Sequence, residues 1–120
     1  MSIRPTKSVH PALSCLDKKE NFRFFDLAND RGVYGAGALA DHDDCLEVHL
    51  EVSRFGPGVL RSLREDAAEL KRMARDLGKN RIVGVRIESG PQADVRWPKF
   101  TRLLGFTGQR LYQAAELWLD

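Results

Sequence analysis

The sequence predicts an α+β fold in which a single mixed sheet is built from an antiparallel meander and a strand–helix–strand unit. Residues 45–52 alternate apolar and polar side chains, as a strand between two different environments does. Residues 58–77 repeat apolar side chains at steps of three and four, which is typical of an amphipathic helix, and residues 81–88 return to strand composition. A strand–helix–strand unit places its two strands parallel through a right-handed crossover, so the sheet is mixed.

An N-terminal hairpin precedes this unit. Residues 22–28 are aromatic and apolar and predict a strand, and the polar turn Asn29-Asp30-Arg31-Gly32 follows. Residues 33–40 predict the return strand, although Gly35 and Gly37 lower its strand propensity. A second polar turn, residues 41–44, connects it to the strand at 45–52, so the first three strands are antiparallel.

The long helix follows the turn Gly56-Pro57-Gly58 and ends before Gly78. Its charged residues predict a solvated face with i,i+4 ion pairs. A helix that opens directly after a strand directs unpaired N–H groups and the positive end of its dipole at one place, which favours an anion. The alternative is a tight turn in which Pro57 only sets the backbone angle that starts the helix.

The two ends of the chain carry weaker signals. Residues 1–21 predict an irregular segment with one helical turn around residues 12–16, and residues 22–120 predict one domain. Near the C-terminus we expect a loop at 89–91, a short helix at 97–104 and a final strand at 110–119.

Composition and charge give further information on the class of protein. The 120 residues carry 19 basic and 17 acidic side chains, a net charge of +2, which gives no indication of nucleic-acid binding. No apolar run is long enough to span a bilayer, and the N-terminus lacks the apolar stretch of a secretory signal. Cys15 and Cys45 lack the spacing of metal ligands, so we expect reduced thiols, no metal site and a cytoplasmic location.

The order of these elements resembles the GCN5-related N-acetyltransferase (GNAT) fold from residue 22 to the C-terminus. Residues 46–52 resemble the family's central strand, whose backbone holds the pantetheine arm of the cofactor, and residues 53–58 occupy the place of its pyrophosphate loop. The helix 58–77 with the strand after it resembles the crossover, and residues 99–106 end in the frequent Leu-Gly-Phe.

The resemblance implies an acetyl-CoA-dependent N-acetyltransferase that acylates an amine of a small molecule or a protein. The cofactor contacts that it implies are backbone groups of the central strand and of the loop and helix start: Leu50, Glu51, Val52, Gly56, Gly58, Val59 and Leu60.

Acyl transfer to an amine needs a base that removes a proton from the amine. Glu47, His49 and Glu51 share the polar face of the strand, and we predict Glu47 or His49 as the base. His49 is the first choice because the ordinary pKa of histidine is near neutrality. The alternative is a solvated sheet face whose polar residues only contact water.

The chain also departs from the family pattern. Ser53 stands where the family loop has Gln or Arg, Pro57 has no N–H to donate, and Thr101 stands where the family often has a tyrosine acid. The segment before residue 22 is too short for the family's acceptor-binding helices. These departures favour a second hypothesis, a non-catalytic GNAT-like module of bacteriophage or prophage type that acts as a homodimer or binds a protein partner.

Overall fold

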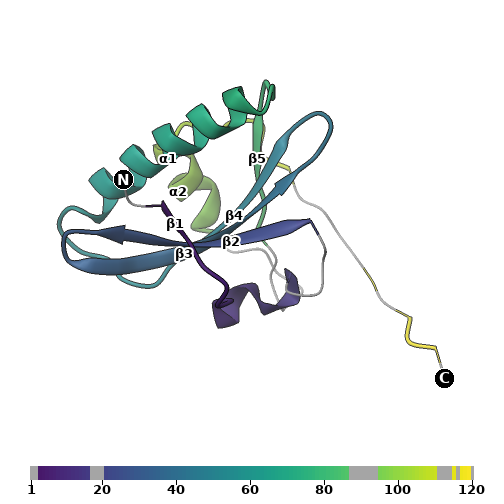
Figure 1. Ribbon diagram of the computed structural model, residues 1–120, viewed down its shortest axis with the longest axis horizontal. Coiled ribbons are helices and arrows are strands. Elements are labelled where there is room, and N and C mark those ends of the chain that lie inside the picture. Colours follow the sequence, from purple (N-terminus) through teal and green to yellow (C-terminus); the bar gives the residue numbers. More distant parts are fainter. Residues whose placement is uncertain (1–2, 17–20, 87–94, 111–114, 116, 120) are drawn as a thin grey trace. The chain divides into compact units, whose positions relative to one another are not determined.

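The computed structural model describes residues 3–16, 21–86, 95–110, 115 and 117–119 of the chain (Figure 1). The chain forms two compact units, Met1–Ile87 and Glu88–Asp120. In their described residues, the first unit holds a five-stranded sheet, a long helix and a short 3₁₀ helix, and the second holds one short helix.

The sheet has its strands in sequence order. Neighbouring strands are antiparallel from the first to the fourth, whereas the fourth and fifth are parallel and joined by the long helix. The strands are β1 (Ile3–Pro5), β2 (Phe22–Asn29), β3 (Gly32–Asp41), β4 (Leu46–Val52) and β5 (Ile82–Gly84), and the long helix is α1 (Val59–Asp76). The predicted α+β fold with a mixed sheet and a crossover helix is therefore confirmed.

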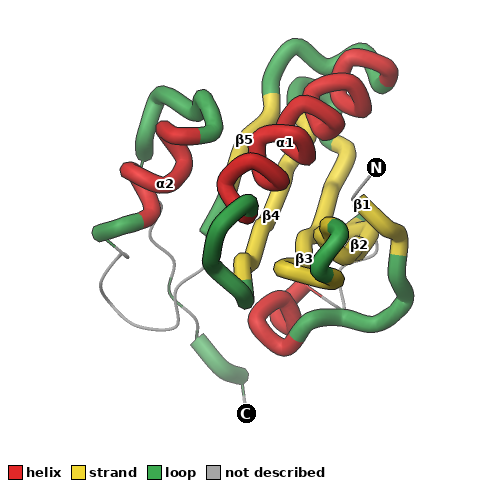
Figure 2. The backbone as a smooth tube through the Cα atoms, turned by 90° about the vertical axis from the view of Figure 1, so that its left-hand side faces the viewer, coloured by secondary structure: helices red, strands yellow, loops and turns green. Residues whose placement is uncertain are grey.

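Two helices cover opposite faces of the sheet. In Figures 1 and 2, α1 lies along one face, and the 3₁₀ helix η1 (Pro11–Leu16) lies against the other. Leu13 and Leu16 of η1 form a buried cluster with Ala36 and Ala38 of β3. The sheet face toward η1 is consequently a second apolar core and not a surface open to water.

The glycines of β3 make room for large side chains of β2. Gly37 pairs with Phe25 and Gly35 pairs with Leu27. A Cβ added at Gly37 would lie 2.2 Å from Phe25 Cζ, and one at Gly35 would lie 2.5 Å from the Glu51 carbonyl oxygen. Only glycine lets these neighbours approach so closely, which explains why the uninterrupted strand β3 contains Gly35 and Gly37.

Glycines also delimit α1. Gly58 precedes the helix with φ of 88°, and Gly78 follows it with φ of 76°. Both angles favour glycine, which explains why the helix begins and ends where the sequence predicts.

A buried polar pair joins α1 to the sheet. An irregularity in the β2–β3 register places Tyr34 outside the regular pairing, and its hydroxyl donates a hydrogen bond to Asp66 of α1. Burial, followed by the hydrogen bond to Asp66, raises the pKa of Tyr34. Burial also raises the pKa of Asp66, although the hydrogen bond from Tyr34 acts against it.

The structure differs from the sequence prediction mainly at the ends. Strand β1 was not predicted, whereas the helical turn near residues 12–16 is found as η1. The short helix α2 (Trp97–Leu103) matches its prediction. Strand β5 is shorter than predicted, and residues 87–94 lie outside the described residues.

The predicted final strand at 110–119 is not found in its described part, because Arg110, Ala115 and residues 117–119 belong to no strand. Residues 111–114 and 116 lie outside the description. The division into a leading segment and a domain from residue 22 stays a prediction. None of the helices in the described residues is long and apolar enough to cross a membrane.

Candidate functional site

The strand β4 extends beyond its pairing with β5. The Leu46 N–H donates to the Arg81 carbonyl (3.2 Å), and the Val48 carbonyl accepts from the Val85 N–H (3.0 Å), so both residues direct their peptide groups toward β5. The parallel register ends at Val48 and Gly84, whereas β4 continues to Val52. Peptide directions alternate along a strand, so Leu50 and Val52 direct their N–H and C=O groups to the same side, past the paired part of β5.

The third predicted backbone contact lies differently. Glu51 pairs with Ala36, and its peptide groups are turned toward β3. The side chain of Glu51 forms an ion pair with Arg86 (3.6 Å between Oε2 and the guanidinium). Of the three residues, Leu50 and Val52 are therefore the ones whose backbone faces the end of the β4–β5 ladder.

A tight corner connects β4 to α1. The N–H groups of Ser53 and Arg54 both donate to the Tyr34 carbonyl (3.0 and 3.2 Å), which holds the end of β4 on β3. Gly56 has φ of 153° and Gly58 has φ of 88°. A Cβ at either glycine would meet nothing within 4 Å, so glycine is required by the backbone conformation and the space around the corner is open.

The start of α1 carries no negative side chain. Its N-cap residue Gly58 forms no side-chain cap, and its first turn contains no acidic residue. The Val59 N–H is held by the Gly56 carbonyl (3.2 Å), and the Pro57 nitrogen has no hydrogen. Among the described residues no backbone carbonyl accepts from the N–H groups of Leu60 and Arg61, so these groups of the first helical turn are available to an anion.

The arginines near the corner differ in their roles. The Arg54 guanidinium donates to the Arg31 carbonyl (2.9 Å) and to Asn29 Oδ1 (3.2 Å), so it fastens the β2–β3 turn. The Arg61 side chain is 87% exposed and lies 3.6 Å from Glu65 in an ion pair. Arg61 is thus the cation of the first helical turn that an anion in the corner would meet.

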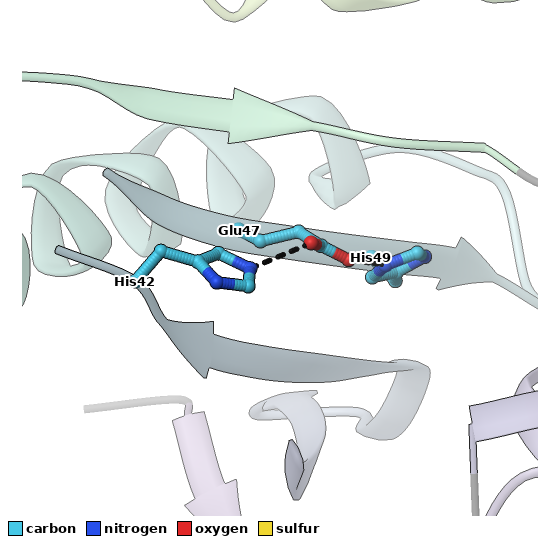
Figure 3. A network of polar contacts seen from close by, with 3 residues as sticks. All are labelled: His42, Glu47 and His49. Atoms are coloured by element: carbon cyan, nitrogen blue, oxygen red, sulfur yellow. Dashed lines mark hydrogen bonds and ion pairs between the residues drawn. The ribbon is translucent and has the colours of Figure 1, made fainter. Parts of the chain in front are cut away.

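Three polar side chains, those of His42, Glu47 and His49, meet at the β3–β4 connection, on the sheet face opposite α1 (Figure 3). Glu47 Oε1 lies 2.8 Å from His42 Nε2, and Glu47 Oε2 lies 2.5 Å from His49 Nε2. Figure 3 shows the two imidazoles on opposite sides of the carboxylate. Partial burial acts to raise the pKa of Glu47, but the hydrogen bonds from His49 and His42 outweigh it and lower the pKa below its ordinary value.

The three members of this cluster differ in exposure. His49 is only 4% exposed, and its ring meets the Phe22 ring edge-on with a centroid separation of 5.5 Å. The side chain of His42 is 39% exposed and that of Glu47 is 23% exposed. The polar sheet face is therefore not solvated at His49, whereas His42, the most exposed member, places the half-buried Glu47 carboxylate close to solvent.

The sequence indicates only that His42 belongs to the polar turn at residues 41–44. The structure brings it to Glu47 because the β3–β4 connection is short: Asp41 pairs with Leu46, and the His42 N–H donates to the Cys45 carbonyl (3.0 Å). The separation of five residues across a polar turn was the available signal. A histidine at the start of the turn and a glutamate at the start of the second strand lie close enough for their side chains to contact each other.

Thr101 is a buried residue of the second unit. Its hydroxyl lies 3.1 Å from the carbonyl oxygens of Trp97 and Pro98 and accepts a hydrogen bond from Gln109 Nε2 (2.9 Å). The residue is 4% exposed. Its hydroxyl is committed to the end of α2, where the Thr101 carbonyl also accepts from the Phe106 N–H (3.1 Å).

The described residues contain no group of three His, Cys, Asp or Glu side chains suited to hold a metal ion. Cys45 is a free, buried thiol, and burial, with the nearby Asp44 carboxylate, raises its pKa. A buried thiol with a raised pKa is a poor nucleophile, and Cys45 is a residue of the core.

Comparison with known proteins gives a fold and no sequence family. No protein-family model and no curated protein matches the chain. Among solved structures, an aminoglycoside acetyltransferase from an uncultured soil metagenomic sample, in complex with sisomicin, has a TM-score of 0.60 at 12% identity, covering 96% of this chain and 79% of that one.

Two further structures lead to the same conclusion. The ribosomal-protein-alanine N-acetyltransferase from Brucella melitensis biovar Abortus 2308 has a TM-score of 0.58 at 13% identity, covering 86% of this chain and 76% of that one. The aminoglycoside N-acetyltransferase AAC(6')-Iy, in complex with CoA, has a TM-score of 0.56 at 14% identity, covering 88% and 83%. The chain has the GNAT-like acetyltransferase fold.

Proposed function

We propose that the protein is an acetyl-CoA-dependent N-acetyltransferase that acylates an amine of a small molecule or a protein. One observation carries this proposal: the peptide edge of Leu50 and Val52 continues past the β4–β5 ladder and leads into an open glycine corner at the start of α1. The fold shared with acetyltransferases supports it.

The residues at this edge fit the two polar parts of CoA. Leu50 and Val52 would hydrogen-bond the amide-containing pantetheine arm as an added strand is bonded. Gly56 and Gly58 leave room for the pyrophosphate, and the Leu60 and Arg61 N–H groups with the Arg61 side chain supply positive charge. Val59 contributes less than predicted because its N–H is already bonded to Gly56. Bound there, acetyl-CoA supplies an acyl group activated as a thioester.

The polar cluster suggests how this chain removes a proton from the amine. The lowered pKa of Glu47 makes its carboxylate a weak proton acceptor, and both of its oxygens already contact imidazoles. His42 is the most exposed member, and its Nδ1 atom is not used by Glu47. We assign the role of base to His42, with Glu47 and His49 as the residues that orient it.

Calorimetry with acetyl-CoA tests the cofactor site. We expect micromolar binding by the wild-type protein and its loss in Gly56→Glu, which places a carboxylate in the corner. Gly78→Glu is the matched control, because Gly78 also has a positive φ and open space but lies past the opposite end of α1. Absence of binding at millimolar acetyl-CoA, or equal losses in the two variants, would refute the site.

Turnover with a panel of primary amines then tests the base. His42→Ala should bind acetyl-CoA as tightly as the wild type but transfer the acyl group at least ten-fold more slowly, because a positioned base contributes roughly 10²–10⁴-fold. Glu47→Gln should change the pH profile of kcat/KM without removing CoA binding. Full activity of His42→Ala would return the assignment to Glu47 or His49.

A second function is favoured by three features of the site. Pro57 lacks a donor, the Arg54 guanidinium is used by the β2–β3 turn, and the Thr101 hydroxyl is used by its own helix. These support a non-catalytic binding or assembly protein. It predicts no specific CoA binding and a homodimer or partner complex, which analytical ultracentrifugation of the CoA-free protein would detect.

A further inference from the structure

The outer surface of α1 separates its charges by sign. Successive helical residues are rotated by about 100°, so the helix can be divided into sectors. One exposed sector, about 100° wide, carries five basic side chains, which we call the basic ridge: Arg61, Arg64, Lys71, Arg72 and Arg75. Ala68 is the other residue of this sector, and the acidic residues Glu65, Glu69 and Asp76 lie together beside it.

Three members of the ridge form no ion pair with a described carboxylate. Arg61 and Arg72 pair with Glu65 and Glu69 along the border with the acidic side. Arg64, Lys71 and Arg75 are exposed, and no carboxylate in the described part of the chain forms an ion pair with them. The net charge of +2 hides this arrangement, because it also counts acidic residues outside the ridge, including those beside it on α1.

The ridge has the length and composition of a surface for a polyanion. It runs from Arg61 to Arg75, which at 1.5 Å per residue is about 20 Å. Ala68 at its middle leaves the backbone accessible to close approach. Duplex DNA presents about one negative charge per 1.7 Å of its axis, so a row of cations of this length can face several phosphates at once.

The chemistry around the ridge distinguishes between classes of partner. A protein interface has a desolvated, mainly apolar centre, whereas the centre of this ridge is Ala68 between charges. A helix that lies on a membrane needs a row of large apolar side chains, whereas Leu60 is the exposed large apolar residue within α1. We propose that the basic ridge binds the phosphate backbone of nucleic acid without reading its sequence, independently of acyl transfer.

Fluorescence anisotropy with a labelled 25-base-pair duplex of mixed sequence tests the proposal. We expect a Kd of about 10–100 μM at 50 mM salt and a logarithmic salt slope of about −3, the value for some three displaced counterions. Arg64→Glu/Lys71→Glu should weaken binding at least ten-fold. The control Arg4→Glu/Lys7→Glu changes the net charge equally at exposed positions outside the ridge and should weaken binding less than two-fold.

Each outcome has a defined meaning. Equal weakening by the two double variants would overturn the ridge, since binding would then follow net charge alone. Undetectable duplex binding by the wild type at 50 mM salt would also overturn it. If the protein binds vesicles containing anionic lipid more tightly than the duplex, and this binding depends on the ridge, the partner of the ridge is a membrane surface and not nucleic acid. Circular dichroism of both variants verifies that α1 is retained, because the substituted side chains lie outside its buried face.

Discussion

Replacing Gly37 by alanine should destabilise the sheet at the pairing of β2 with β3. The added Cβ would lie 2.2 Å from Phe25 Cζ, 2.6 Å from Phe25 Cε2 and 2.9 Å from the His49 carbonyl oxygen. Phe25 is 3% exposed, so its ring has little space into which to move. Overpacking of a core costs about 1–3 kcal/mol, and replacing glycine returns roughly 0.5–1 kcal/mol by restricting the unfolded chain. The net loss should be about 1–2 kcal/mol.

Urea unfolding followed by circular dichroism measures this loss as a lower midpoint at unchanged slope. The double variant Gly37→Ala/Phe25→Leu provides the control, because leucine lacks the ring atoms that the new methyl group meets. Its free energy of unfolding should be about 1 kcal/mol higher than the value obtained by adding the losses of the two single variants. A stability of Gly37→Ala equal to or above that of the wild type would refute the close approach of Phe25 to β3.

Three further predictions follow from single residues. Gly58→Ala should cost about 1–2 kcal/mol, because φ of 88° is unfavourable for alanine, and a loss below 0.3 kcal/mol in urea unfolding (about the error of such measurements) would contradict the assigned helix start. Tyr34→Phe removes a buried hydrogen bond to Asp66 and should cost roughly 1–3 kcal/mol by the same measurement; a neutral result would show that the pair does not hold α1. For Glu47 the folded-state pKa is lowered, so its contribution is present above the ordinary glutamate pKa of 4.5 and is lost as the pH falls through the lowered value. Glu47→Gln should therefore be less stable than the wild type at pH 7 by an amount that shrinks below pH 4, and a difference independent of pH would exclude this linkage.

The central elements were predictable because their signals are local. Alternation along β4 and the three- and four-residue steps of α1 identify a strand and an amphipathic helix, and Gly58 and Gly78 define where the helix begins and ends. The strand–helix–strand order then determines that β5 is parallel to β4. These elements were recognised without any information on long-range contacts.

Other features depend on contacts that a single sequence does not display. Strand β1 is three residues long and contains Pro5, so it has almost no pattern of its own and forms by pairing with β2. The close approach of Phe25 to Gly37 requires the strand register, which is why Gly37 looked unfavourable in the sequence.

The candidate site was predictable in its position more than in its detail. Gly56 and Gly58 were identified from the turn before α1, and their positive φ angles agree with that interpretation. The bond between the Val59 N–H and the Gly56 carbonyl, and the reach of His42 to Glu47, depend on the folded geometry of two connections. Such contacts become visible only when the turn conformations are known.

Mapping CoA onto the backbone amides by ¹⁵N NMR tests the central claim most directly. Titration of the labelled protein should shift the amide signals of Leu50, Val52, Gly58 and Leu60 in a saturable way, whereas that of Gly78 at the far end of α1 should stay unchanged. Shifts confined to other parts of the chain, or none at millimolar CoA, would contradict a cofactor site at the end of β4 and the start of α1.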